Sequence, residues 1–101
     1  DRRSMARLLW QAGEANRGLG RNEEAIIAYT RSGLLFSDAS TASPSLAAAA
    51  ELAAVRWPTG TASRQLWGEA LRVAERSGNK EITDLARAAL LELNDQGGSR
   101  P

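Results

Sequence analysis

Four glutamates stand where a carboxylate could act as an acid or a base: Glu51, Glu69, Glu75 and Glu81. Acid–base or nucleophilic catalysis requires such a group to lie beside a reacting partner. Each of the four instead falls in a helical pattern where a solvated glutamate is usual, and Arg72 follows Glu69 at a spacing that allows an ion pair. These residues therefore do not indicate an active site.

The composition removes most other catalytic chemistry. The 101 residues include no cysteine and no histidine, which excludes thiol nucleophiles, disulfides, imidazole bases and the commonest metal ligands. The sequence also has no glycine-rich phosphate loop and no carboxylate cluster at metal-binding spacing. We expect no enzymatic activity, no cofactor, and no catalytic, cofactor-binding or metal-binding residue.

The charges nearly cancel, at +1, and twelve arginines and the single Lys80 are spread along the chain. A nucleic-acid binder needs a basic stripe that neutralises phosphates. The arginines of the first helical stretch do not all share one face: Arg2, Arg3, Arg7, Arg17 and Arg21. Arginine-mediated binding of nucleic acid is therefore the weakest of the three functions considered below.

No segment indicates a membrane protein. The longest apolar run, from Leu46 to Ala50, is far shorter than the ~20 residues that span a bilayer. No signal peptide opens the chain. We expect a soluble, cytoplasmic protein with no membrane partner. Because the sequence begins at Asp1 and not at a methionine, we also expect either an excised piece of a longer chain or a chain that lost its start.

Alanine and leucine dominate the periodic stretches, and alternating strand patterns do not appear, so the sequence predicts an all-α fold. Any binding residues must therefore lie on helices or on the turns between them. Glycine, proline and asparagine divide the chain into five predicted helices: 4–17, 23–36, 44–56, 62–76 and 80–94. Gly20 and Gly78 are suited to end helices, and Asn22, Ser43 and Asn79 to cap them. A polar linker over 37–43 offers nothing to bury.

The helical spacing of apolar residues predicts a buried face on each helix. On the first helix this face comprises Leu8, Leu9, Ala12, Gly13 and Asn16. On the second it comprises Ala25, Ile26, Tyr29 and Gly33. On the third, mostly alanine, it comprises Ala47–Ala50, Ala53 and Ala54. The last two faces are Leu66, Trp67, Ala70, Leu71 and Ala74, and Ile82, Leu85, Ala86, Ala89, Leu90 and Leu93.

Two short segments recur at an offset of 45 residues. Glu24-Ala25-Ile26 matches Glu69-Ala70-Leu71, and Arg31-Ser32-Gly33 matches Arg76-Ser77-Gly78. Between Leu9 and Tyr29, Leu9 and the small Gly13 lie one turn apart, Gly20 marks a turn, and the small Ala25 is followed one turn later by the large Tyr29. With these features the stretch resembles a tetratricopeptide repeat, which implies that Ala25 stands at the close contact between paired helices.

The resemblance implies antiparallel helical hairpins stacked as a short right-handed superhelix of about five helices. Residues 1–96 would form one domain, with a first repeat over 5–38, a second over 44–78 and a capping helix over 80–94. The capping helix resembles the first helix of a further repeat. Residues 97–101 would be a flexible tail.

In this family the inner groove, lined by the first helix of each pair, usually holds a peptide or helix of a partner. The resemblance therefore implies a protein-interaction module, as a scaffold or as the sensing part of a regulator. Its candidate partner-binding residues lie off the apolar face of the first helix: Arg7, Trp10, Gln11, Glu14 and Arg17. Exposed tryptophan and arginine often dominate interface energies.

The roles of two tryptophans and the oligomeric state remain open at this stage. Trp10 either contacts a partner or packs on the next hairpin. Trp57 fits either a surface patch or a small separate core, whereas Trp67 is expected in the core. The chain could also dimerise, because a short open array exposes its terminal faces. Self-association is therefore the second hypothesis for function, ahead of nucleic-acid binding.

Overall fold

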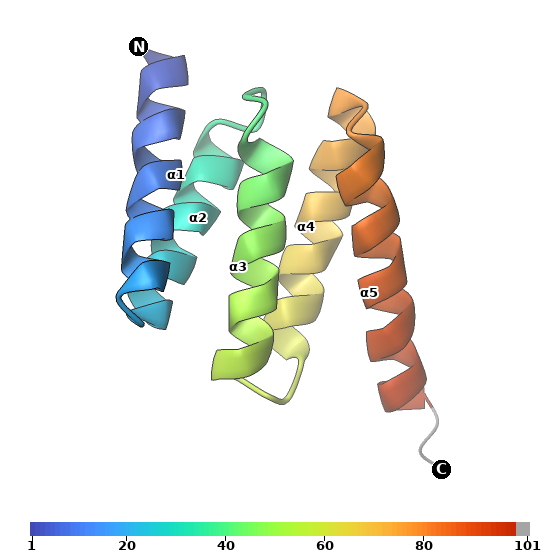
Figure 1. Ribbon diagram of the computed structural model, residues 1–101. Coiled ribbons are helices and arrows are strands. Elements are labelled where there is room, and N and C mark those ends of the chain that lie inside the picture. Colours follow the sequence, from blue (N-terminus) through green and yellow to red (C-terminus); the bar gives the residue numbers. More distant parts are fainter. Residues whose placement is uncertain (99–101) are drawn as a thin grey trace.

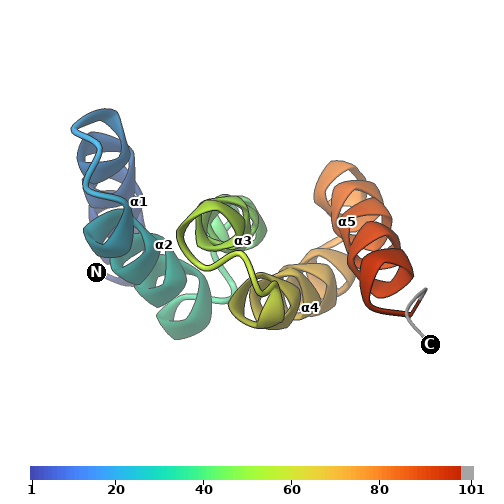
Figure 2. The same ribbon diagram turned by 90° about the horizontal axis from the view of Figure 1, so that it is seen from below.

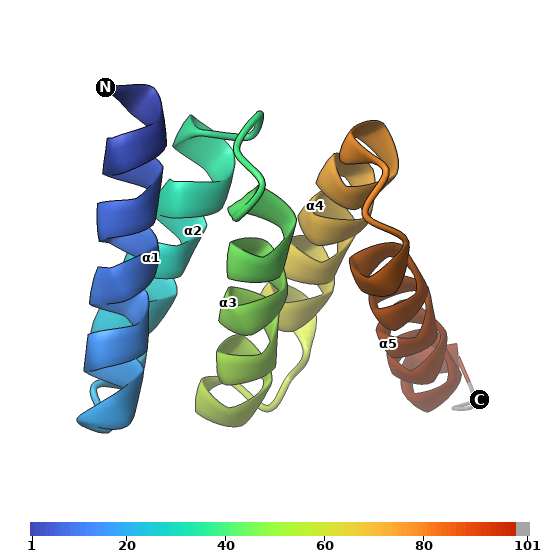
Figure 3. The same cartoon turned by 45° about the horizontal axis from the view of Figure 1, so that its top comes forward.

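The computed structural model describes residues 1–98, with side chains through Asp95. It contains five helices, α1 to α5: Arg2–Gly18, Asn22–Leu35, Ala42–Arg56, Thr61–Ser77 and Lys80–Gly98. They run alternately down and up, and each packs mainly on its neighbours in the sequence (Figures 1 and 3). The predicted all-α fold of about five antiparallel helices is confirmed.

Seen along the helices, the chain follows a zigzag (Figure 2). The odd-numbered helices α1, α3 and α5 lie on one side, and α2 and α4 lie on the other. The array is elongated, with principal extents of 50 × 31 × 17 Å. The helices α1 and α5 therefore lie at opposite ends, where each has one main neighbour.

The helix ends follow the predicted glycine and asparagine signals at two of the turns. Gly20 and Gly78 adopt left-handed backbone conformations, with φ of 77° and 76°. Asn79 accepts a hydrogen bond from the Ile82 amide through its side chain, at 3.1 Å, and so caps α5. The predicted cap at Asn22 is wrong. Asn22 is already helical, and Arg21 precedes it without a side-chain capping bond.

The predicted start of the third helix is also wrong. The helix begins at Ala42, not at Pro44, and Ala42 and Ser43 are buried. Ser43 is therefore no cap, and its hydroxyl accepts a hydrogen bond from the Asn79 side chain at 3.2 Å. The end of the polar linker is drawn into the core because Gly33, which has no side chain, leaves room for the Ala42 carbonyl oxygen.

The last helix is longer than predicted and reaches Gly98. Residues 97 and 98, assigned to a tail on sequence grounds, are helical, whereas 99–101 lie outside the described residues. None of the described helices is long and apolar enough to cross a membrane.

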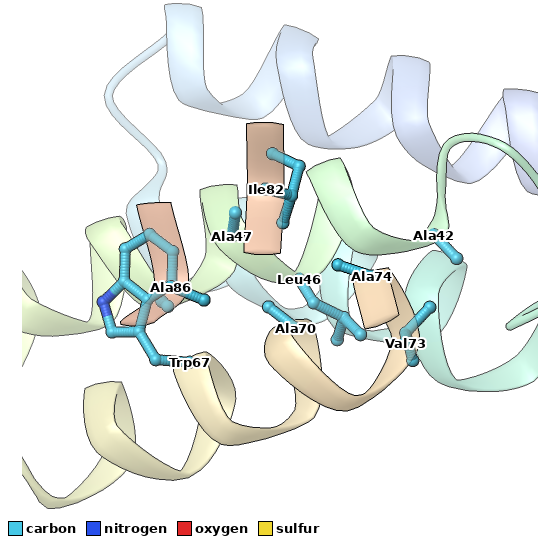
Figure 4. Close-up of a cluster of buried hydrophobic side chains, with 10 residues drawn as sticks. Ala42, Leu46, Ala47, Trp67, Ala70, Val73, Ala74, Ile82 and Ala86 are labelled. Carbon is cyan, nitrogen blue, oxygen red and sulfur yellow. The ribbon is translucent and has the colours of Figure 1, made fainter. Parts of the chain in front are cut away.

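Two groups of buried side chains form the core. One lies between α1, α2 and α3 and is centred on Tyr29, which is 0% exposed. The other joins α3, α4 and α5 and includes Leu46, Trp67 and Ile82 (Figure 4). Many members of both groups are alanines, so the helix backbones approach one another closely.

The buried faces agree with the predictions except at one leucine on each end helix and at Ala54 of the central helix α3. Leu8 and Leu85, predicted to be buried, are 59% and 44% exposed, and Ala54 is exposed. The buried residues of α1 are Gly13, as predicted, and Ala6, which the predicted face does not include. The end helices have only one main neighbour, so part of each apolar face stays uncovered.

Candidate interaction face

The five candidate partner-binding residues of α1 fall into two groups. Arg7 and Gln11 are exposed, and Arg7 borders a cavity at the start of the helix. Trp10, Glu14 and Arg17 instead lie beside Tyr29 of α2, and of these three Glu14 and Arg17 are exposed. Trp10 is half-buried and packs against the core group of α2 and α3, the packing role left open above.

Tyr29 is held from several sides. Its ring centroid lies 5.3 Å from that of Trp10, with the rings tilted at 56°. Its hydroxyl donates a hydrogen bond to the Glu14 carboxylate. Burial and this hydrogen bond raise the pKa of Tyr29 to about 12, and the nearby Arg17 guanidinium partly opposes the rise. Trp10, Glu14 and Arg17 thus position a buried ring.

The raised pKa of Tyr29 predicts that the protein loses stability at high pH. Below pH 10 the hydroxyl keeps its proton in both folded and unfolded chains, so its contribution to stability is constant there. Between its ordinary pKa of 10.0 and about 12 the unfolded chain loses the proton first, and the folded state is destabilised as pH rises. We expect a loss of roughly 3 kcal/mol across this interval.

Tyrosinate absorbance would measure the pKa of Tyr29 directly, because Tyr29 is the only tyrosine. In a Glu14→Gln variant the pKa should move part of the way back, since burial remains. A wild-type titration at the ordinary pKa would show that the ring is not enclosed as described.

A cavity of about 370 Å³ opens between α3 and α5, which touch each other only slightly. Trp67 and Ser63 of α4 contribute to its lining together with Ala54, Ala89 and Leu93. Its two charged residues are both acidic, Glu51 of α3 and Glu92 of α5. The cavity therefore combines an apolar lining with a negative charge.

The sequence predicts that Trp67 belongs to the core, which its 5% exposure confirms, but it contains no signal for this cavity. In the sequence Glu51 is a candidate only for a catalytic acid, and Glu92 has no distinguishing feature. The lining residues come from three helices, and only the angle between α3 and α5 brings them together. An acidic residue one turn from a small apolar residue is too common in helices to signal such a site.

A larger cavity, of about 560 Å³, lies between the start of α1 and the connection from α2 to α3. Arg2, Arg3 and Arg7 line one side, and Phe36 and Asp38 contribute to the other. Arg2 forms an ion pair with Asp38 at 2.9 Å. The charge here is positive, opposite to that of the cavity between α3 and α5.

The face of α1 opposite its buried residues Ala6 and Gly13 carries a stripe of apolar side chains, four of them exposed and one, Ala12, half-buried. We call it the α1 stripe; it consists of Met5, Leu8, Ala12, Ala15 and Leu19. Its three large members are 49%, 59% and 68% exposed. The spacing of three and four residues is that of a helix-pairing seam. No helix of residues 1–98 covers it, because α1 packs mainly on α2.

Comparison with known proteins identifies no relative: no family model, curated protein or solved structure matches the chain significantly. Among the described residues, no group of three or more acidic side chains is arranged to hold a metal ion.

Proposed function

We propose that the chain is a protein-interaction module that binds a peptide or helix of a partner protein. The observation that carries this proposal is the cavity between α3 and α5, with its apolar lining and two acidic residues. Binding sites are typically concave, mainly apolar and marked by a few polar groups. The resemblance of residues 9–29 to a tetratricopeptide repeat supports the same function.

The charges of the cavity define its occupant. Trp67, Ala89 and Leu93 offer contact to an apolar side chain, whereas Glu51 and Glu92 favour a basic residue beside it. Neither glutamate forms an ion pair within residues 1–98, so both remain available to a partner. We therefore expect a segment in which an apolar anchor is flanked by lysine or arginine.

Filling the cavity should abolish this binding. Peptides would be selected from a displayed random library on the wild-type protein and then tested on Ala89→Phe. Ala89 is half-buried and borders the empty space, so the phenylalanine ring would occupy the place of the anchor. We expect affinity to fall by at least about tenfold, the equivalent of 1.4 kcal/mol. Isothermal titration calorimetry would measure it.

Ala88→Phe is the matched control, because Ala88 neighbours Ala89 on α5 but is exposed. Ala54→Phe, on the opposite wall, repeats the test should Ala89→Phe unfold the protein. Selected peptides that bind all variants equally would place the interaction elsewhere. Failure to select any peptide would contradict the proposed function.

A second function, self-association, is favoured by the α1 stripe. In an antiparallel pair of α1 helices, Met5 and Leu8 of one copy would face Ala12 and Ala15 of the other. Large side chains would thus pack against small ones on both sides of a two-fold axis. Such a dimer would bury Leu8, which in the single chain is 59% exposed.

Light scattering over a range of concentrations would test this dimer. We expect the mass of the wild type to rise towards twice that of the chain, and Leu8→Glu to stay monomeric, because a charge would be buried in the seam. Leu91→Glu is the control, since Leu91 is equally exposed, at 65%, but lies on α5. A wild type that is monomeric throughout would eliminate this second candidate.

A further inference from the structure

The cavity at the start of α1 has an excess of positive charge. Its lining includes three arginines and one aspartate, which leaves two positive charges uncompensated. The three arginines lie within the first two turns of α1 and line the cavity together with residues of the connection from α2 to α3. The start of α1 and this connection lie at the same end of the array (Figure 1). A concave surface with charges of one sign concentrates ligands of the opposite sign.

Arg2 is already engaged within the chain. Its guanidinium donates hydrogen bonds to Asp38 at 2.9 Å and to the Leu35 carbonyl oxygen at 3.3 Å, and lies 5.2 Å from the centroid of the Phe36 ring. The hydrogen bond from Arg2 lowers the pKa of Asp38, so this carboxylate stays ionised and continues to neutralise Arg2. Arg2 and Asp38 therefore neutralise each other at the edge of the cavity.

Arg3 and Arg7 are different. They lie one turn apart on α1, and neither forms a hydrogen bond or an ion pair with any residue described by the structure. Two like charges at this spacing on a helix repel each other. A bound anion would remove that repulsion. Guanidinium groups also match carboxylates geometrically, because they can donate two parallel hydrogen bonds.

We propose that this cavity binds carboxylates of an acidic segment of the partner, with Arg3 and Arg7 as their ligands. This inference rests on the proposed function and adds a second, chemically distinct contact to it. A nucleic-acid backbone fits less well, because it requires a longer row of basic groups. Arg17, the next arginine along α1, lies beside Tyr29 instead.

A hexaglutamate peptide is the probe. It would be titrated into the full chain while backbone amide chemical shifts are followed by nuclear magnetic resonance. We expect saturable shifts confined to residues 2–8 and 36–41, and at least about tenfold weaker binding in the Arg3→Gln/Arg7→Gln double variant. Both arginines are exposed, so the variant should keep its fold, which its amide spectrum would show.

Arg72→Gln/Arg76→Gln is the matched control. These two arginines also lie one turn apart and exposed, but on α4, and their removal changes the net charge equally. Arg72 differs from Arg3 and Arg7 in forming an ion pair, with Glu69 at 2.5 Å, so the pair is matched in position and charge change and not in its contacts. The control should retain wild-type affinity. Equal weakening in both double variants would mean general charge attraction and would overturn the proposal. So would inorganic phosphate that shifts the same amides and displaces the peptide at similar concentration, because the site would then prefer phosphate.

The library selection separates this inference from the proposed function. Selected peptides that lack acidic residues, lose affinity in Ala89→Phe and bind Arg3→Gln/Arg7→Gln normally would support the module and overturn the arginine site. Selected peptides with an acidic stretch whose affinity falls in Arg3→Gln/Arg7→Gln would support both. Hexaglutamate binding in the absence of any selected peptide would support the arginine site and contradict the module.

Discussion

Trp67→Ala should lower the free energy of unfolding by about 3–5 kcal/mol, the usual cost of removing a buried tryptophan side chain. Trp67 is 5% exposed and belongs to the group that joins α3, α4 and α5. Because α5 touches α3 only slightly, its attachment depends on this group, in which Trp67 is the largest side chain (Figure 4). A domain of this size has a total stability of roughly 5–15 kcal/mol, so much of it would be lost.

Chemical denaturation followed by circular dichroism would measure the change, and hydrogen exchange would show whether the amides of α5 lose protection first. Trp57→Ala is the control. Trp57 is 37% exposed, and the Arg56 guanidinium lies over its ring, 5.4 Å from the ring centroid. We expect it to cost less than about 1 kcal/mol. Equal losses in the two variants would mean that Trp67 does not hold the C-terminal half together.

Gly33→Ala should destabilise the protein by about 1–3 kcal/mol, although alanine is the better helix former. A Cβ atom at this position would lie 2.9 Å from the Ala42 carbonyl oxygen and press against the Leu46 side chain. The backbone of Ala42 cannot yield without moving α3. Gly68→Ala is the matched control, because Gly68 is also inside a helix but has nothing within 4 Å of an added Cβ. It should gain about 0.5–1 kcal/mol.

A double-mutant cycle would locate the cause of the Gly33→Ala effect. Leu46 is completely buried, and Leu46→Ala alone should cost about 2–5 kcal/mol. In that background the added methyl group fills vacated space, so Gly33→Ala should cost less than in the wild type. We expect a coupling of at least about 0.5 kcal/mol, from denaturation curves of the four proteins. Strict additivity would show that the contact between positions 33 and 46 is not responsible.

Local signals predicted the elements of this fold well. Gly20, Gly78 and Asn79 act through the backbone of their own turn, so their neighbours in sequence suffice to place the helix ends nearby. The start of α3 could not be predicted in this way. Ser43-Pro44 is a good local capping pair, but burial of Ala42 against Gly33 extends the helix by two residues. The tertiary contact outweighed the local preference.

The candidate site was harder to predict than the fold. The first helix offers Arg7, Trp10 and Glu14 on neighbouring faces, and nothing local distinguishes a residue that contacts a partner from one that packs on Tyr29. The same difficulty explains Leu8, which has the spacing of a core residue but faces outwards on an end helix. Helical periodicity shows which residues share a face, not whether another helix covers that face.

The sequence by itself determined that the chain is helical, where its helices lie, and that cysteine and histidine chemistry is absent. These properties depend on residue type and on spacing within a few turns. Only the tertiary structure decided that Trp10 and Glu14 enclose Tyr29, that α3 and α5 diverge around Trp67, and that Arg3 and Arg7 border a cavity. Those arrangements depend on the angles between helices, which arise from the packing of many small side chains at once and leave no signal in any one segment.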